Sequence, residues 1–439
     1  MKSIEDLFVR KGAWILPKSG TLGKKAENLL SNSATIESTK DWGFRLPTPS
    51  LVIPYEYYRD IEGPCYTILD WINHFFKDIK EVGVSSNSPD EDFGKRRPGQ
   101  YVSAKIEHLD RPNSTFEIDN VLNSYYSESA RLRRQKLRLS EQGMSLLVRP
   151  FVKGMQTGSF SNFGDICLIT HTDPYYEMDA MQKPSLGKTW VDNKGDILDE
   201  HSRATTWNVM ITDRLFRLSA SLPQIPNKGW EIEYVIKAQE GSEIPLFYVM
   251  QTTPIERQPR FAVKPTDRNI FDAKEVIGFG EYKTNGILYL PLNFYPPQIA
   301  TFDERNKDYC LVTQHGNIST TDSNKRGNIL LQTNNAKVVL DVDNSRAYKR
   351  GGFSAHITQR FREEGSALAG LFTNELKETL LSQMDYIFRA NRKLQGPIYS
   401  PIGLRTCADE YEQKATVEMT TEIKPFAKLG DVLAGGIKP

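Results

Sequence analysis

Two strand-like segments joined by a short turn restrict the fold of this chain more than any other feature of its sequence. Residues 230–238 alternate between apolar and polar side chains, residues 239–245 have turn chemistry, and residues 246–251 form a second strand-like run. The pattern predicts a β-hairpin. Centring the turn near Ser242 places Glu233 opposite Gln251, and Glu231 shares the face of Glu233 because alternate strand residues point the same way.

The predicted pairing brings a carboxylate and an amide oxygen together. Such hard oxygen donors suit Mg²⁺, so Glu233 and Gln251 are candidate metal ligands. The polar face of a surface hairpin explains the same residues, so the hairpin alone leaves both interpretations open.

Composition narrows the class of protein. The chain has 439 residues with 56 Lys and Arg against 55 Asp and Glu, which predicts two or three domains and disfavours non-specific binding to nucleic acid or an anionic membrane. The basic run at residues 131–138 has an amphipathic helical pattern and is interpreted as a solvated helix face.

The four cysteines are far apart, without a CxxC pair, so the sequence predicts neither a disulfide framework nor a structural zinc site. Without a secretory signal pattern or an apolar run of about 18 residues, we expect a soluble, cytoplasmic protein.

Periodicity predicts a mixture of helices and strands. Helical patterns are expected at residues 24–31, 54–61, 68–79, 116–139, 204–222, 354–364 and 374–394, and strands at residues 50–53, 101–106, 146–152, 287–292, 309–313, 328–332, 337–342 and 415–423. Residues 82–99 form a long polar segment that we expect to be a functional loop. Residues 256–275 are charged, contain two prolines and show no period, which is typical of an interdomain linker.

A glycine-flanked basic segment begins the first predicted helix. Lys25 follows Gly23 in the first helical turn, where a lysine and free backbone N–H groups can bind a phosphate together. Taken on its own, this segment is better explained as a solvated helix start.

A second glycine-containing segment surrounds a histidine. Gly351 and Gly352 allow a sharp turn, Ser354 can cap a helix, and His356 then lies in its first turn. The positive end of the helix dipole there favours a neutral, nucleophilic imidazole and accommodates a phosphoryl group on its nitrogen. The same segment is also explained by an ordinary histidine at the start of a helix, without a catalytic role.

These features, taken in order, resemble the phosphoenolpyruvate synthase and pyruvate phosphate dikinase superfamily of phosphotransferases. The segments that carry the resemblance are LGKKAENL at residues 22–29, GFRLPTPSLVI at 43–53, VSSNSPDED at 84–92, PGQY at 98–101, LVRPFV at 147–152, EIEY at 231–234, FYVMQTTPI at 247–255, GGFSAHI at 351–357 and REEGSALAG at 362–370.

The resemblance implies a multidomain α+β or α/β protein, with an ATP-grasp-like nucleotide-binding domain followed by a small swivelling phosphohistidine domain. The expected divisions are residues 1–255 for the nucleotide domain, 256–275 for the linker, 276–371 for the phosphohistidine domain and 372–439 for a C-terminal extension.

The resemblance also implies ATP and Mg²⁺ as cofactors and assigns site residues. His356 is the expected catalytic residue, and Glu233 and Gln251 are the expected metal ligands. The expected nucleotide-binding residues are Lys25, Ser85, Ser86, Arg149, Glu233 and Gln251.

The sequence departs from the family pattern at several positions. Val84 and Thr253 replace arginines, and Arg149 replaces a glutamine. Valine and threonine lack the fixed guanidinium fork that clamps phosphate. Residues 372–439 are too few for the family's barrel-shaped acceptor domain, which needs about 250 residues.

Two functions therefore stay open. The first is an ATP-dependent phosphotransferase that phosphorylates its own His356 and relays the phosphoryl group to an unknown acceptor, either a small molecule or a group on a partner protein. The second is a non-catalytic relative that binds a nucleotide as a sensor or assembly partner.

Overall fold

The chain folds into two units, each with its own sheets and cores. Unit 1 comprises Met1–Ala180 and Ser185–Arg257, and unit 2 comprises Met181–Pro184 and Gln258–Pro439. The structure is a computed structural model that describes residues 3–89, 101–107, 111–127, 130–131, 134–135, 138–171, 187–200, 207–242, 245–257, 270–272, 275–277, 279–291, 298–314, 333, 335–343, 367–372, 387, 389–410, 414–420 and 426–435.

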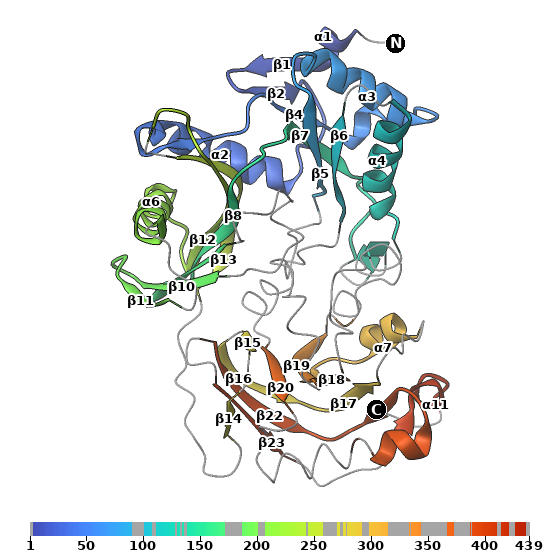
Figure 1. Ribbon diagram of the computed structural model, residues 1–439. Coiled ribbons are helices and arrows are strands. Elements are labelled where there is room, and N and C mark those ends of the chain that lie inside the picture. The colour runs from blue at the N-terminus through green and yellow to red at the C-terminus, as the bar shows by residue number, and fades with distance from the viewer. Residues whose placement is uncertain are drawn as a thin grey trace. The chain divides into compact units, whose positions relative to one another are not determined.

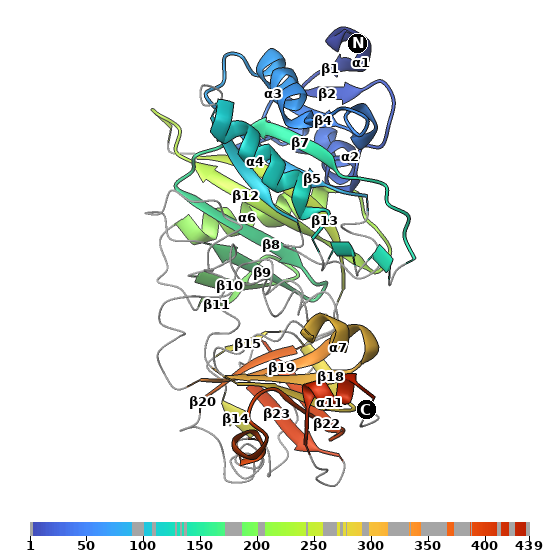
Figure 2. The same ribbon diagram turned by 90° about the vertical axis from the view of Figure 1, so that its right-hand side faces the viewer.

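The first sheet of unit 1 has six strands in the order β1-β2-β4-β7-β5-β6. Its strands are β1 (Phe8–Lys11), β2 (Trp14–Pro17), β4 (Ser50–Ile53), β5 (Glu81–Asn87), β6 (Ser103–Glu107) and β7 (Ser145–Pro150). Only β2 and β4 pair in parallel among these neighbours. Helices α3 (Pro64–Phe75) and α4 (Arg111–Ser124) cover one face of this sheet (Figures 1 and 2). A short helix α1 (Ile4–Leu7) and the 3₁₀ turns η1 (Lys40–Trp42) and η2 (Tyr55–Tyr57) complete the unit's N-terminal part.

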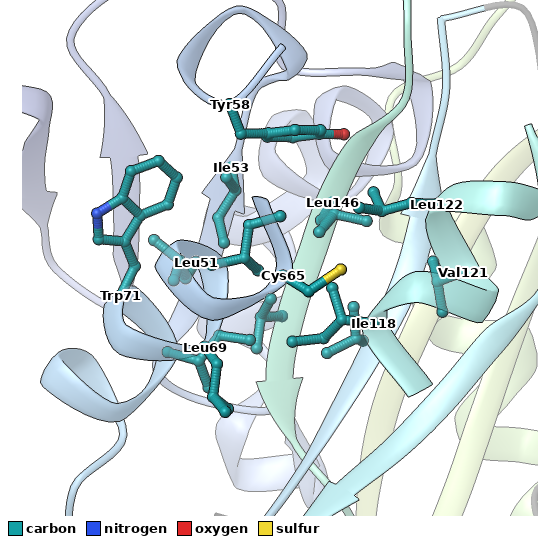
Figure 3. Packing of buried hydrophobic residues seen from close by; sticks show 14 of the residues in the cluster. Leu51, Ile53, Tyr58, Cys65, Leu69, Trp71, Ile118, Val121, Leu122 and Leu146 are labelled. Carbon is teal, nitrogen blue, oxygen red and sulfur yellow. The ribbon is translucent and has the colours of Figure 1, made fainter. Parts of the chain in front are cut away.

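The helix-covered face buries a continuous apolar cluster. Helix α3 contributes residues at helical spacing, among them Cys65, Leu69 and Ile72, which pack against strand residues such as Leu51 and Leu146. Figure 3 shows this cluster between the two helices and the strands. The core holds the six-stranded sheet rigid behind the site described below.

The second sheet of unit 1 has seven strands in the order β11-β10-β9-β8-β12-β13-β3. Its strands are β3 (Phe44–Arg45), β8 (Gln156–Asn162), β9 (Ile166–His171), β10 (Gly187–Asp192), β11 (Ile197–Glu200), β12 (Lys228–Lys237) and β13 (Leu246–Glu256). All neighbours pair antiparallel except β13 and β3. Helix α6 (Trp207–Ser221) lies along one face of this sheet (Figure 1).

Helix α2 (Lys24–Ser38) lies between the two sheets of unit 1 (Figure 1). Its buried residues Ala26, Leu29 and Ile36 belong to one apolar cluster with Leu147 of the first sheet and Ile232 of the second. Helix α2 therefore packs on both sheets of unit 1.

The described residues of unit 2 form two sheets and three helical segments. The four-stranded sheet has the order β14-β23-β22-β16, and the seven-stranded sheet has the order β15-β20-β19-β18-β17-β21-β24. The strands are β14 (Ile270–Asp272), β15 (Glu275–Ile277), β16 (Phe279–Thr284), β17 (Ile287–Leu290), β18 (Tyr309–Gln314), β19 (Ala336–Asp343), β20 (Ala367–Phe372), β21 (Ile398–Ser400), β22 (Leu404–Asp409), β23 (Lys414–Met419) and β24 (Ala427–Lys428). The helices are α7 (Ile299–Arg305) and α11 (Leu429–Leu433), and residues 389–394 are also helical.

Unit 2 is layered around its larger sheet. The run β17 to β20 is parallel, and its alternate residues point to opposite faces. Leu288 and Leu311 pack with Phe302 of α7 on one face, whereas Tyr289 and Val312 belong to a cluster with Leu404 and other residues of the smaller sheet on the opposite face.

Several predicted elements differ from the structure. Residues 82–87, expected in a polar loop, belong to β5, because Val82 and Val84 point into the core and the strand pairs with both β6 and β7. The helix expected over residues 116–139 is divided: α4 begins at Arg111 and ends at Ser124, and residues 130, 131, 134 and 135 are helical again. Residues 54–61 form only a short 3₁₀ turn.

The predicted boundaries near the linker and the C-terminus also differ. The linker range 256–275 includes strand β14, while residues 258–269 lie outside the described ranges. Residues 372–439, expected as an extension, supply β22 and β23, which pair with β16 and β14, so they are part of unit 2. The helix expected at residues 354–364 and the strand expected at residues 328–332 lie outside the described residues.

The basic run at residues 131–138 also has a different role where it is described. Arg134 is buried, its Nη2 donates to the carbonyl oxygen of Tyr125 at 2.8 Å, and its guanidinium lies 3.7 Å from the centre of the Tyr125 ring. This arginine is therefore part of the packing beneath α4 rather than of a solvated face.

No helix in the described part of the chain is both long and apolar enough to cross a membrane.

Candidate functional site

The N-terminus of α2 is held by Asn87, the last residue of β5. Gly23 precedes the helix with φ +83° and has no side chain to cap it. The amide of Asn87 takes over this function: its Oδ1 accepts from the backbone N–H of Ala26 at 3.1 Å, and its Nδ2 donates to the carbonyl oxygen of Leu22. A Cβ on Gly23 would lie 2.0 Å from the carbonyl oxygen of Asn87, so only glycine allows this approach.

Lys25 and Ser86 meet at this helix start. The Nζ of Lys25 lies 3.5 Å from the Oγ of Ser86, which is fully buried on β5. Ser85 is half-buried and points to the opposite face of the strand, because successive strand residues alternate. The structure thus brings Lys25 to Ser86, whereas Ser85 shares the strand face of Asn87.

The hairpin has the register that the sequence predicts. Strands β12 and β13 pair Glu233 with Gln251 and Glu231 with Thr253. Glu233 and Gln251 are both 7% exposed, so the pair is almost buried rather than part of a surface hairpin. The Nε2 of Gln251 donates to the Oγ1 of Thr253 at 3.1 Å, which orients the amide so that its oxygen is the group left for a cation.

A bulge next to this pair connects the hairpin to the first sheet. The register of β12 and β13 shifts after Glu233, so that Met250 has no direct partner in the ladder. Nη1 of Arg149, on β7, donates to the carbonyl oxygen of Met250. Arg149, which the resemblance assigns to the nucleotide, therefore also links the two sheets of unit 1 beside Gln251.

Helix α2 is tied to the same strand by hydrogen bonds. Nδ2 of Asn32 donates to Oγ1 of Thr252 at 3.0 Å, and this hydroxyl donates to the carbonyl oxygen of Asn28 at 3.3 Å. Thr252 is adjacent to Gln251, and Asn28 lies one helical turn from Lys25. These contacts pack α2 on β13 from the sheet face opposite Gln251, because neighbouring strand residues point to opposite faces.

The face of the second sheet that carries Glu233 is polar although it is buried. Glu231, Ser159, Ser161 and Thr170 share this face and are each at most 5% exposed. The opposite face carries apolar residues such as Ile232 and packs on α2 and α6. Burial of so many polar groups on one face costs free energy unless they bind each other or a ligand, which distinguishes this face from an ordinary sheet interior.

Sequence reasoning missed Asn87, Ser159 and Thr170. Asn87 was visible only as the end of the VSSN segment, and its partners lie more than 60 positions earlier in the chain. Ser159 belongs to a polar alternation in β8 with Thr157 and Ser161, and Thr170 of β9 lies opposite Ser159; only the pairing of β12, β8 and β9 reveals that they share the face of Glu233.

The positions that depart from the family pattern have structural roles here. Val84 is fully buried in the apolar cluster beneath α3 and α4. Thr253 orients Gln251, as described above. Neither side chain can supply the charge of the arginine that it replaces.

The predicted catalytic residue, His356, lies outside the described residues, so its role stays a prediction. The described residues contain no group of three or more His, Cys, Asp or Glu arranged as a metal site, so Glu233 and Gln251 would have to share a cation with a ligand's own oxygens.

The four cysteines are free thiols. Burial raises the pKa of Cys167 to about 12, which keeps this thiol protonated and makes it a packing residue rather than a nucleophile.

Comparisons with known proteins give distant structural similarities. No known family description matches the sequence, and no curated protein matches it. Among solved structures, the ATP-grasp ligase PsnB in complex with a minimal precursor is 12% identical with a TM-score of 0.22, covering 52% of this chain and 52% of that chain. The D-alanine–D-alanine ligase from Bacillus anthracis is 10% identical with a TM-score of 0.24, covering 52% and 57%. The ATP citrate lyase from Methanothrix soehngenii, in complex with citrate and coenzyme A, is 9% identical with a TM-score of 0.28, covering 83% and 99%.

The matched part of the chain spans about half the length of the two ligases. The chain is thus distantly similar in structure to ATP-grasp ligases and to ATP citrate lyase, and no comparison assigns it to the phosphoenolpyruvate synthase superfamily.

Proposed function

We propose that unit 1 binds ATP together with Mg²⁺ and that the chain is an ATP-dependent phosphotransferase. One observation supports this proposal: helix α2, whose first turn carries Lys25, is hydrogen-bonded through Asn28 to Thr252 of β13, the strand that also carries Gln251. A helix that offers a cation and backbone N–H groups for phosphate thus contacts the strand that carries one of the hard oxygen donors for a metal.

The residues present fit a magnesium–nucleotide complex. Lys25 and the N-terminal turn of α2 offer positive charge and N–H donors for phosphate oxygens, and Ser86 lies beside the lysine. The carboxylate of Glu233 and the amide oxygen of Gln251 would hold Mg²⁺, which supplies charge neutralisation to the phosphates when bound. Arg149 fixes the strand next to Gln251, so the metal ligands keep their positions without the nucleotide.

The acceptor of the phosphoryl group follows from the sequence resemblance. We propose that His356 accepts it on a ring nitrogen and then passes it to a second acceptor, which is a small molecule or a group on a partner protein. His356 belongs by its position in the chain to unit 2, which is a compact unit distinct from unit 1. A relay requires the histidine to visit two places, and a separate unit is able to carry it between them.

Labelling with ATP tests the transfer. The full chain is incubated with Mg²⁺ and ATP that is labelled at either the β or the γ phosphate, and protein-bound label is tested for acid lability and alkali stability. We expect label in the wild type and none in His356→Ala, while His74→Ala, a change of a half-exposed histidine on α3, retains the label. Label that persists in His356→Ala would contradict the histidine relay.

A nucleotide-binding protein without turnover is the second candidate. Burial of Val84 in the apolar core and the use of Thr253 as a hydrogen-bond acceptor favour it, because both replaced arginines are absent from the phosphate site. ATP binding by wild-type protein without any label on protein would select this function over the first.

A further inference from the structure

The segment that leads into helix α2 is held by the 3₁₀ turn η2. We call residues 19–23, which lie directly before the first helical turn, the α2 entry loop. Oε1 of Glu56 accepts from the backbone N–H of Thr21 at 3.2 Å and from the hydroxyl of Thr21 at 2.8 Å. The hydroxyl of Tyr57, the next residue of η2, accepts from the backbone N–H of Ser19 at 3.1 Å. The 3₁₀ turn therefore holds the entry loop at two points.

The entry loop also packs closely on this turn. Gly20 has φ +97°, and a Cβ at this position would lie 2.9 Å from Cβ of Pro54 and 3.2 Å from Oε2 of Glu56. A side chain there would push the loop away from Glu56, so glycine allows the loop to reach this acceptor. Strand β7 holds the loop as well, because the hydroxyl of Ser145 donates to the carbonyl oxygen of Thr21 at 2.9 Å.

The groups that hold the entry loop differ in exposure and charge. Ser145 is buried and Tyr57 is half-buried, and both are neutral, whereas Glu56 is exposed and carries a carboxylate. Water screens the contacts of an exposed carboxylate, so this residue contributes little to the stability of the whole unit. Its effect is confined to the loop whose N–H and hydroxyl groups it accepts.

We infer that Glu56 is a positioning residue for nucleotide binding by unit 1. The inference rests on the proposed function, in which Lys25 and the first turn of α2 bind phosphate oxygens. Glu56 sets the entry loop before the nucleotide binds, which reduces the ordering cost of binding. Glu56 acts as a hydrogen-bond acceptor and not through its charge, because a negative charge beside the loop repels phosphate.

Substitutions of Glu56 separate the acceptor from the charge in calorimetric titrations of the full chain with ATP and Mg²⁺. We expect Glu56→Ala to bind ATP about fivefold more weakly, a modest loss because the contact is exposed. Glu56→Gln keeps an oxygen that can accept both bonds, so its affinity should stay within about twofold of the wild type or be higher. Thr21→Val removes one of the two donors and should cause no further loss in Glu56→Ala, because its partner is already absent.

Hydrogen exchange shows whether the effect is local. In Glu56→Ala, the backbone amides of the entry loop should exchange faster in the free protein, and ATP should restore part of their protection. The rest of unit 1 should exchange as in the wild type, and the free energy of unfolding should stay the same. A merely structural role would instead raise exchange throughout the unit.

Glu62→Ala is the matched control. Glu62 is an exposed acid in the same connection between β4 and α3, and it has no hydrogen bond or ion pair among the described residues. Its loss removes the same charge and should leave ATP affinity unchanged. Unchanged or tighter ATP binding in Glu56→Ala, or equal losses in Glu56→Ala and Glu56→Gln, would overturn the inference while leaving the proposed function intact. A wild type that binds no ATP would overturn both.

Discussion

At the scale of single residues, the site depends on a glycine and an asparagine that have no charge to offer. Gly23 lets the chain approach the backbone of Asn87, and the amide of Asn87 then bonds to Leu22 and Ala26 on both sides of the helix start. The first-turn N–H groups and Lys25 are thereby held in place before any ligand binds. Preorganisation of this kind reduces the ordering cost of binding an anion.

Gly23→Ala should damage both stability and the site. Its φ of +83° disfavours any side chain, and the new Cβ would lie 2.0 Å from the Asn87 carbonyl oxygen. We expect the free energy of unfolding to fall by about 2 kcal/mol or more, and ATP affinity to fall with it. Urea unfolding and nucleotide titration measure the two effects.

Gly12→Ala is the matched control for this change. Gly12 also has a positive φ, +59°, but nothing lies within 4 Å of the position its Cβ would take. We expect a loss of about 1 kcal/mol from the backbone conformation alone and no change in nucleotide affinity. Equal effects of the two substitutions would show that the contact with Asn87 has no role in the site.

At the scale of elements, the hairpin was predictable and its surroundings were not. Counting residues about Ser242 predicts the pairing of Glu233 with Gln251, but the register beside the turn, where Lys237 pairs with Leu246, would place Glu233 opposite Met250. The bulge shifts the register by one residue and produces the predicted pair. The bulge at Met250 depends on Arg149 from a strand 101 positions away, and local sequence does not contain that information. The segment VSSN looks like a polar loop for the same reason: its burial comes from strands and a helix distant in sequence.

The packing of α2 on β13 can be tested with a pair of substitutions. Thr252→Val removes the acceptor of the Asn32 amide, which is fully buried, and should lower the free energy of unfolding by about 1–3 kcal/mol. Asn32→Leu combined with Thr252→Val removes both polar partners, so the double variant should be more stable than the sum of the single losses predicts. Chemical denaturation measures each variant, and strictly additive losses would contradict a coupled contact.

At the scale of the whole molecule, the chain consists of two units with separate cores. Unit 1 has the apolar clusters beneath α3 and α4 and around α2, and unit 2 has two clusters on the faces of its larger sheet. A mixed α/β, multidomain protein was predictable from the alternation of helical and strand patterns. The pairing of residues 404–419 with β14 and β16 was not, because strand pairs of this sequence separation have no local signal.

Separate cores predict that unit 1 functions as a nucleotide-binding fragment. A fragment of residues 1–257 should fold and bind ATP with Mg²⁺ at an affinity within about threefold of the full chain. It should take no label from ATP, because His356 is absent from it. Circular dichroism, calorimetry and labelling check these three expectations, and a labelled fragment would show that the phosphoryl acceptor lies in unit 1.

The central claim is that Glu233 and Gln251 hold the magnesium ion of a bound nucleotide, and the dependence of ATP binding on Mg²⁺ tests it most directly. Glu233→Gln keeps the size of this buried side chain and removes its charge. In calorimetric titrations of the full chain, we predict that Mg²⁺ strengthens ATP binding to the wild type. In Glu233→Gln this gain should be about tenfold smaller or lost, with magnesium-free binding through Lys25 little changed. The same gain from Mg²⁺ in Glu233→Gln and in the wild type would contradict the account.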